Sequence, residues 1–134
     1  MYDVIIATYN GEHYIIEQIE SIVFQTVKPM AIYIRDDMST DDSLHLIKNY
    51  IECYKGDIDF ILVESDVNLG YVKNFECLVR RTKSNIVFFC DQDDIWISNK
   101  AELFLNKFKS NPLTQLIFSN AFLVDESLNQ IGML

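Results

Sequence analysis

Apolar stretches of two different periods take turns along this chain. Continuous runs rich in Val, Ile and Phe, which are typical of strands covered on both faces, occupy residues 2–10, 30–37, 58–65 and 84–90. The segments between them carry apolar residues at helical spacing and span residues 11–26, 39–54 and 68–82. This alternation predicts parallel strands with right-handed helical crossovers, a three-layer α/β/α sandwich with a mostly parallel sheet.

The helical segments also predict which side chains are buried. The first helix should expose a polar face made of Glu12, Glu17, Gln18, Glu20 and Ser21. The third should bury one side, formed by Val72, Phe75, Leu78 and Val79. Asn10 is a plausible cap of the first helix, and Ser39 with Asp42 gives the second a start similar to a capping box.

Beyond residue 96 the pattern predicts one more helix, with an apolar side and a stop at residues 110–112, and then a strand at 113–126. All 134 residues fit one domain. The chain finishes on the apolar residues 129–134 without a polar tail or cap, so we expect it to be truncated.

Charge and cysteine content narrow the classes of function. The net charge of −9 disfavours nucleic acid as a partner and means that a phosphate ligand would need a bridging cation. The three cysteines lack CxxC spacing, so we interpret them as buried small hydrophobes rather than as disulfides or a zinc site. No signal peptide and no apolar run of about 20 residues is visible. These features favour a cytoplasmic protein.

The polar residues that follow the strands are candidates for chemistry. In parallel sheets ligands bind at the carboxyl ends of the strands, so the clusters at residues 8–10, 35–42 and 91–94 should meet at one rim. Asp91, Asp93 and Asp94 repel one another, and a divalent cation would offset that repulsion. Oxygen ligands favour Mg²⁺ or Mn²⁺. For Asp41 and Asp42, helix capping explains the carboxylates at least as well.

Four motifs stand in order along the chain, "VIIATYNGEHYIIEQIESIVFQT", "IYIRDDMSTDDS", "NLGYVKNFE" and "FFCDQDDIWISNK". Together they resemble the nucleotide-sugar-dependent glycosyltransferases of family 2, which have the GT-A fold. The likeness covers nearly the whole chain and corresponds to the N-terminal, donor-binding part of such enzymes. The stretch "DQDDIW" is most similar to bacterial members that build surface polysaccharides, among them rhamnosyltransferase-like proteins.

The resemblance implies a site for a nucleotide-diphosphate sugar. It places nine residues around the nucleotide, either at its pocket, beside the base or near the ribose. They are Thr8, Tyr9, Asn10, Asp36, Asp37, Asn68, Gly70, Lys73 and Asp91. It also implies a Mn²⁺ or Mg²⁺ ion that bridges the two phosphates, with Asp93 and the nearby Asp91 as its ligands. Asp94 would support them.

The activity that the resemblance implies is transfer of a sugar, with inversion, to a saccharide or lipid-linked acceptor in cell-surface polysaccharide synthesis. The full-length protein would act in the cytoplasm at the inner face of the membrane, in peripheral association with it. The sequence offers no convincing base for the acceptor, because Asp125 and Glu126 fit a turn better. We therefore expect the fragment to be inactive in transfer.

Two other classes of protein remain open. A noncatalytic nucleotide-sugar-binding module would also show the donor half of the site without a base. A phosphoacceptor signalling domain has a similar sheet and an acidic Mg²⁺ pocket, but its acid pair should follow the first strand. Here that strand ends in Thr8, Tyr9 and Asn10, which disfavours this class.

Overall fold

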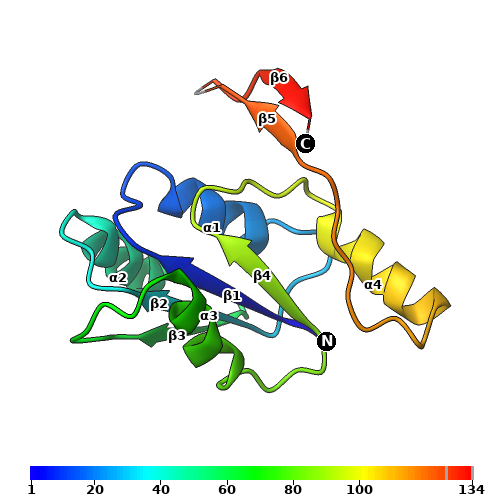
Figure 1. The fold of residues 1–134 in the computed structure, drawn as a ribbon, viewed down its shortest axis with the longest axis horizontal. Coiled ribbons are helices and arrows are strands. Elements are labelled where there is room, and N and C mark those ends of the chain that lie inside the picture. The colour runs from blue at the N-terminus through cyan, green and yellow to red at the C-terminus, as the bar shows by residue number, and fades with distance from the viewer. Residues whose placement is uncertain (126, 134) are drawn as a thin grey trace. The chain divides into compact units, whose positions relative to one another are not determined.

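The computed structural model describes residues 1–125 and 127–133 (Figure 1). The chain divides into two compact units, Met1–Glu102 and Leu103–Leu134. No helix among the described residues is both long enough and apolar enough to cross a membrane. That residues 1–134 act as one functional domain stays a prediction.

The first unit is built on a parallel sheet of four strands. These are β1 (Asp3–Thr8), β2 (Ala31–Asp36), β3 (Asp59–Val63) and β4 (Val87–Asp91), and their order in the sheet is β3-β2-β1-β4. All neighbouring pairs are parallel, and the register sets Thr8 beside Asp36 and Ala7 beside Asp91. The four predicted strands are confirmed, and their polar ends meet at one rim as expected.

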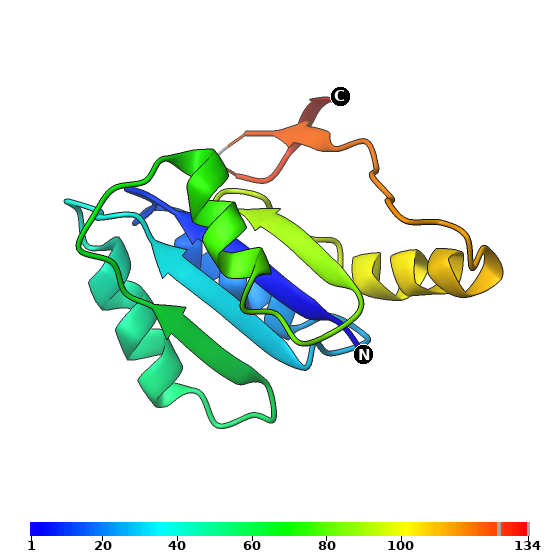
Figure 2. The ribbon, with the colours of Figure 1, turned by 60° about the horizontal axis from the view of Figure 1, so that its bottom comes forward.

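Helices cover both faces of this sheet. The helices α1 (Ile15–Val23) and α2 (Ser43–Cys53) pack beside one another on one face, and α3 (Tyr71–Val79) lies over β1 and β2 on the other. Figure 2 shows α3 in front of the strands and α1 behind them. The predicted three-layer α/β/α arrangement is thus confirmed.

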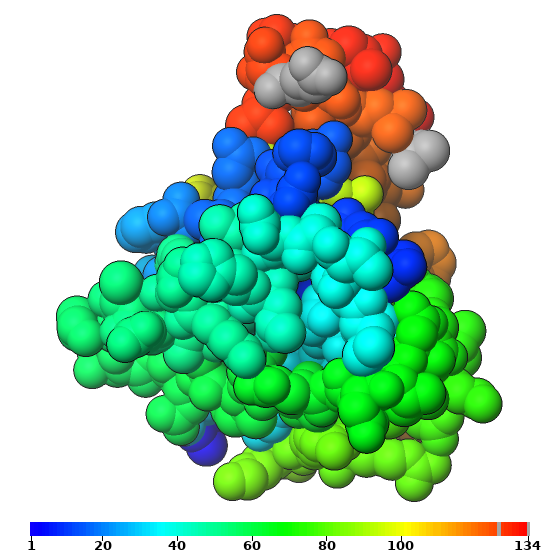
Figure 3. All heavy atoms as spheres, turned by 90° about the vertical axis from the view of Figure 1, so that its left-hand side faces the viewer, coloured from blue at the N-terminus to red at the C-terminus, as the bar shows by residue number. Residues whose placement is uncertain are grey.

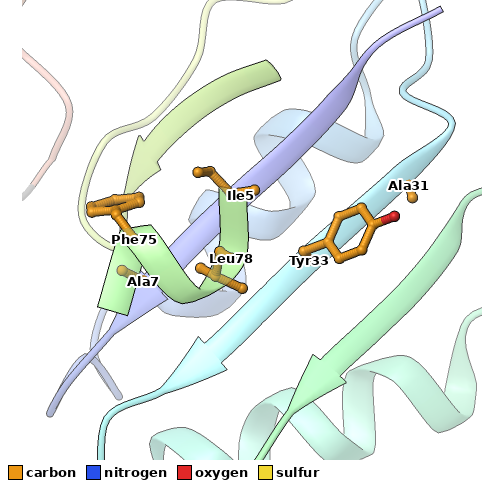
Figure 4. Close-up of a cluster of buried hydrophobic side chains, with 6 residues drawn as sticks. All are labelled: Ile5, Ala7, Ala31, Tyr33, Phe75 and Leu78. Carbon is orange, nitrogen blue, oxygen red and sulfur yellow. The ribbon is translucent and has the colours of Figure 1, made fainter. Parts of the chain in front are cut away.

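The core between α3 and the sheet comes from alternate strand residues. Ile5 and Ala7 of β1, Ala31 and Tyr33 of β2, and Phe75 and Leu78 of α3 form one buried cluster (Figure 4). The intervening strand residues, such as Val4 and Ile6, are buried on the opposite face. Strands buried on both faces read as continuous apolar runs, which is why they were recognisable in the sequence. The outer strands β3 and β4 are exceptions, because β3 is only partly buried and the side chain of Phe89 in β4 is exposed.

Two expectations about helix faces are wrong. Gln18 was placed on the exposed face of the first helix but is fully buried, where its Nε2 donates hydrogen bonds to Cys90 Sγ and to the Asp94 carbonyl. In α3 the exposed residues include Val72 and Val79, while Asn74 is buried. Both polar side chains are buried because each satisfies a partner next to the rim.

The predicted helix caps are also wrong. Asn10 adopts a φ of 51° and its Oδ1 accepts a hydrogen bond from Thr40 N at 2.8 Å, while α1 begins five residues later at Ile15. Ser39 bonds to the carboxylate of Asp36, and Asp42 makes no side-chain hydrogen bond at the start of α2. Asn10 and Ser39 therefore make hydrogen bonds in the loops at the rim and do not cap helices.

The cysteines are free thiols in three different environments. Cys90 is buried, Cys77 is half-buried and Cys53 is exposed. The interpretation as buried small hydrophobes therefore holds for Cys90 and is wrong for Cys53. Burial raises the pKa of the Cys90 thiol well above its usual range, so that thiol is neutral at physiological pH.

The last part of the chain contains α4 (Lys100–Ser110), which confirms the predicted helix, and a small antiparallel hairpin. The strand expected at residues 113–126 is formed only at β5 (Phe122–Val124), which pairs with the unpredicted β6 (Gln130–Met133). Asp125 closes the hairpin, because its carboxylate accepts hydrogen bonds from the backbone of Ser127 and Asn129. Glu126 lies outside the described residues.

Candidate functional site

A cleft of about 690 Å³ opens where the strand order reverses, between the carboxyl ends of β1 and β4. Crevices at this position are where open α/β sheets bind their ligands. Figure 3 looks onto this end of the first unit, where the segments that follow β1 and β2 and precede α3 lie side by side. The cleft is lined by Ala7, Thr8, Tyr9, Asp37, Asn68, Gly70, Tyr71, Asn74, Asp91, Gln92 and Asp93.

Three carboxylates lie at the end of β4 and directly after it. Asp91 is half-buried at the strand end, whereas Asp93 and Asp94 are exposed. Although Asp94 is exposed as a residue, partial desolvation of its carboxyl group raises its pKa, the negative charge of Asp91 raises it further, and Lys100 opposes the shift. The mutual repulsion of these side chains is therefore a property of the folded structure.

Tyr71, at the start of α3, lies beside the turn at residues 91–93, which is called the acidic turn below. Its hydroxyl lies close enough to the carboxylate of Asp91 to feel its charge, and its ring packs edge-on against Phe75 with centroids 5.0 Å apart. Burial, followed by the charge of Asp91, raises the pKa of Tyr71. The hydroxyl therefore stays protonated at neutral pH and is a hydrogen-bond donor on this side of the cleft.

The carboxylate of Asp93 makes no hydrogen bond or ion pair with the rest of the described chain. Within residues 1–125 and 127–133, no three His, Cys, Asp or Glu side chains converge in a way that could hold a metal ion. The acidic turn thus offers a metal ion two carboxylate ligands, Asp91 and Asp93, rather than a complete set of ligands. Sites of this kind hold Mg²⁺ or Mn²⁺ when a phosphate ligand supplies further oxygens.

Gln92 joins the two strand ends that border the cleft. Its Oε1 accepts hydrogen bonds from Thr8 Oγ1 and Tyr9 N, both at 2.8 Å, and its Nε2 donates to Tyr9 O at 3.2 Å. Gly11 leaves room for this amide, because a Cβ at that position would stand 2.7 Å from Gln92 Oε1. This side chain therefore adds to the pairing of β1 with β4 in holding residues 8–9 beside residues 91–93.

Asp37 forms the opposite wall of the cleft. It is buried, and its carboxylate accepts hydrogen bonds from Arg35 Nη1 at 2.5 Å, Leu69 N at 2.8 Å and Gly70 N at 2.7 Å. Burial alone would raise the pKa of Asp37, but the hydrogen bond from Leu69, with those from Arg35 and Gly70, holds it below its usual range. Asp37 is consequently an ionised acceptor at neutral pH.

The turn before α3 is held by Asp37 and by its own Asn68. Asn68 Nδ2 donates to Asp37 O at 2.8 Å, and Asn68 Oδ1 accepts from Gly70 N at 3.1 Å. Gly70 has φ 76° and ψ 165°, a conformation that is essentially restricted to glycine. The backbone therefore requires glycine at position 70, and the side chain of Asn68 adds two hydrogen bonds to the turn.

The structure brings most of the expected site residues together. Seven line the cleft, namely Thr8, Tyr9, Asp37, Asn68, Gly70, Asp91 and Asp93. Three do not. Asn10 bonds to Thr40 in the neighbouring loop, Asp36 is buried and bonded to Ser39, and Lys73 is exposed on α3 and is not a lining residue. Contact of these three with a ligand stays a prediction.

Sequence reasoning missed four lining residues and one residue beside them. Ala7, Tyr71, Asn74 and Gln92 line the cleft, and Arg35 is buried next to Asp37. The sequence contained a sign that Arg35 is buried, because this charged residue directly follows Ile34 in an apolar strand. The helical position of Asn74, on the same side of α3 as Phe75 and Leu78, could also have indicated burial.

Comparisons with known proteins agree with this geometry. The family model described as glycosyl transferase family 2 matches residues 3–127. The chain is 36% identical over 118 residues to the dTDP-rhamnosyl transferase RfbG of Shigella flexneri, which covers 86% of this chain and 38% of that protein. It is 34% identical over 97 residues to the UDP-Glc:alpha-D-GlcNAc-diphosphoundecaprenol beta-1,3-glucosyltransferase WfaP of Escherichia coli, covering 72% of this chain and 37% of that one.

Solved structures support the fold. The chain superposes on S. aureus TarS 1-349 in complex with UDP with a TM-score of 0.72 at 23% identity, covering 83% of this chain and 32% of that TarS fragment. It superposes on the mannosyltransferase PcManGT of Pyrobaculum calidifontis, in complex with GDP-Man and Mn²⁺, with a TM-score of 0.71 at 24% identity, covering 83% of this chain and 32% of that one. At these identities the likeness shows the shared GT-A fold alone.

The chain spans 38% of the length of RfbG and 37% of that of WfaP, so the match concerns one part of these longer proteins. In this chain the family match, residues 3–127, contains all four sequence motifs and the cleft that they form. Because the family model covers nearly the whole chain, from residue 3 to residue 127, this protein belongs to glycosyl transferase family 2.

Proposed function

We propose that the cleft binds the nucleotide-diphosphate sugar of a metal-dependent glycosyltransferase that acts in cell-surface polysaccharide synthesis. The observation that carries this proposal is the convergence of Asp37, Asn68 and Asp91 on one cleft at the point where the strand order reverses. These residues come from three separate motifs of the family. The names of the relatives, a dTDP-rhamnosyl transferase and a UDP-Glc-dependent glucosyltransferase, agree with such a donor.

The nucleoside end of the donor would lie against Asp37. An ionised carboxylate only accepts hydrogen bonds, and its Oδ2 receives one from Gly70. It therefore suits a base with a ring N–H, which uracil, thymine and guanine have and which adenine and cytosine lack. The neighbours in complex with UDP and with GDP-Man carry such bases.

The diphosphate end would lie at the acidic turn. A diphosphate cannot approach Asp91 and Asp93 without a cation, because like charges a few ångströms apart repel strongly. These two carboxylates fit the donor set that Mg²⁺ and Mn²⁺ prefer, and Asp93 has its oxygens available. When bound, the ion would stabilise the negative charge that develops on the leaving diphosphate.

The acceptor half of the reaction is proposed to depend on sequence outside this chain. An inverting transfer needs a base for the acceptor hydroxyl, whether the acceptor is a saccharide or a lipid-linked sugar. Asp125 is exposed and engaged in the β5–β6 turn, where its carboxylate accepts backbone hydrogen bonds from Ser127 and Asn129 that hold the hairpin. We therefore expect the 134-residue chain to bind the donor without transferring its sugar. The full-length enzyme would work in the cytoplasm, associated peripherally with the inner face of the membrane.

The second candidate is a noncatalytic module that binds nucleotide sugars. It is favoured by the lack of a plausible base for the acceptor among residues 1–125 and 127–133 of this chain. Both candidates predict donor binding, and they differ in the behaviour of a longer form. Transfer by a form extended with native downstream sequence would support the enzyme, and binding without transfer by that form would support the module.

Calorimetric titration tests the shared part of the proposal. UDP, dTDP and GDP are each titrated into the chain with Mn²⁺ and with chelator, and ADP serves as the control ligand without a matching ring N–H. We expect at least one of the first three to bind only when Mn²⁺ is present, and more tightly than ADP. Equal binding in chelator would contradict the metal dependence, and failure of all three with Mn²⁺ would contradict the donor site.

A further inference from the structure

Arg35 is the most buried cation of the first unit and has several partners. Its side chain is 4% exposed. One nitrogen, Nη1, donates to Asp37 Oδ1 at 2.5 Å and to Asn74 Oδ1 at 3.1 Å. The other, Nη2, donates to Val67 O at 3.2 Å and to the hydroxyl of Ser65.

Two further hydrogen bonds tie these partners to the backbone of Arg35 and to one another. Asn74 Nδ2 donates to the carbonyl of Arg35 at 3.3 Å, and Ser65 Oγ donates to Val67 O at 2.8 Å. The guanidinium thus joins the end of β2, the loop that follows β3 and the first turns of α3. In the sheet its neighbours on adjacent strands are the small or apolar residues Ala7 and Val63.

A buried ion pair such as that of Arg35 and Asp37 contributes little net stability to a fold. Desolvation of two charges costs several kcal/mol, and apolar residues of similar size often stabilise a core as well or better. The partners of Arg35 are instead grouped around the cleft. Asp37 and Asn74 line it, and Ser65 and Val67 begin the turn that presents Asn68 and Gly70. Arg35 itself does not line the cleft.

We propose that Arg35 is a positioning residue of the donor site, which orients the carboxylate of Asp37 and fixes the 65–70 turn so that they fit the nucleoside. This inference rests on the proposed function. Arg35 acts through other residues, since it touches the cleft only by way of Asp37 and Asn74. The acidic turn at Asp91 and Asp93 lies on the far side of β1 from Arg35 and shares none of these hydrogen bonds.

The two-nitrogen geometry makes lysine a poor replacement. Nη1 serves Asp37 and Asn74 while Nη2 serves the loop, and a single ammonium cannot occupy both positions. Arg35→Lys should keep the charge beside Asp37 and release the 65–70 turn. Ser65→Ala removes one contact of Nη2 without leaving a buried charge unpaired, so this variant should fold even if variants of Arg35 do not.

The test compares two probes on the same proteins, UDP with Mn²⁺ and inorganic pyrophosphate with Mn²⁺. Arg35→Lys, Arg35→Met and Ser65→Ala are compared with Arg80→Met, which removes an exposed arginine of α3 paired with Glu76. We expect the Arg35 variants to lose about tenfold or more in UDP affinity, the equivalent of at least 1.4 kcal/mol. Ser65→Ala should lose less. Pyrophosphate affinity should stay close to that of the wild type in every variant, and Arg80→Met should change neither.

The possible outcomes separate this inference from the proposed function. Wild-type UDP affinity in the Ser65 variant and in the folded Arg35 variants would overturn the positioning role. Parallel loss of UDP and pyrophosphate would also overturn it, because that pattern indicates general disruption of the fold. A wild-type chain that binds neither probe with Mn²⁺ would instead overturn the donor site itself.

Discussion

Gln92 and Tyr9 exchange two hydrogen bonds across the rim of the sheet. Gln92 Oε1 accepts from Tyr9 N at 2.8 Å, and Gln92 Nε2 donates to Tyr9 O at 3.2 Å. The central residue of the acidic turn therefore faces the end of β1, while its neighbours Asp91 and Asp93 border the cleft. An amide is suited to this role because it can donate and accept at once.

Replacement of Gln92 should loosen this connection. Gln92→Leu keeps a similar size but removes the hydrogen bonds to Thr8 and Tyr9, and we expect the free energy of unfolding to fall by about 1–3 kcal/mol. Urea denaturation measures the change. The exposed Gln115→Leu is a matched control that should have little effect. Equal stability of wild type and Gln92→Leu would show that the exchange contributes nothing to the fold.

Gly70 should not tolerate a side chain. Its φ of 76° and ψ of 165° are accessible to alanine only with strain of about 1–3 kcal/mol, although no atom stands within 4 Å of an added Cβ. Gly70→Ala should therefore lower the free energy of unfolding by that amount and weaken nucleotide binding, since Gly70 N donates to Asp37. Val72→Ala, at an exposed site two residues away, is the control. Unchanged stability of Gly70→Ala would mean that the turn relaxes freely.

The metal-dependent part of nucleotide binding should depend on Asp93. Asp93→Asn removes a charged oxygen donor from the acidic turn, so UDP affinity in Mn²⁺ should approach the affinity in chelator. Asp42→Asn is the matched control, because Asp42 is exposed and makes no side-chain hydrogen bond at the start of α2. Calorimetry in both media measures the difference. If the two variants lost the same affinity, Asp93 would have no special role.

Asp37 should make stability depend on pH. Its pKa is lowered in the folded state, so its contribution is complete above the unfolded value of about 3.9 and is lost as the pH falls through the folded value. Asp41, whose pKa is lowered too, adds to the same acid-side loss. Asp37→Asn should reduce this slope and also destabilise the fold by about 3–5 kcal/mol at pH 7, because Arg35 loses its charged partner.

Urea titrations between pH 7 and pH 3 measure both effects, with the exposed Asp66→Asn as the control. The control should follow the wild-type curve at every pH. A wild-type stability that rises on acidification, or an Asp37→Asn variant with the full wild-type slope, would contradict the assignment to Asp37.

The layered fold and the position of the rim could be predicted because they depend on periodicity. Continuous apolar strands such as 3–8 and 31–36 alternate with helical segments, and parallel connection then forces their polar ends to one side. Thr8, Asp37 and Asp91 were found in this way. The short hairpin of β5 and β6 was not fully predicted, because its exposed strands carry no clear alternation.

Buried polar side chains were the main source of error. Gln18 and Asn74 were misjudged or missed because their hydrogen-bond partners, among them the Asp94 carbonyl and the Arg35 side chain, lie far away in the sequence. Asn10 and Ser39 have the composition of helix caps, but each finds a partner in the adjacent loop instead. The intrinsic preferences of Asn and Ser allow either a helix cap or a loop contact, and tertiary hydrogen bonds decide which of the two forms.

The central claim is that a nucleoside diphosphate and a divalent ion bind together in this cleft, with the ion at Asp91 and Asp93. Paramagnetic broadening of backbone amide signals by Mn²⁺, with Mg²⁺ as the diamagnetic reference, locates the ion directly. In the presence of UDP, dTDP or GDP, we predict selective loss of the amide signals of Asp91, Gln92 and Asp93, and much weaker loss without nucleotide. Broadening that is centred elsewhere, or that is the same with and without nucleotide, would contradict the account.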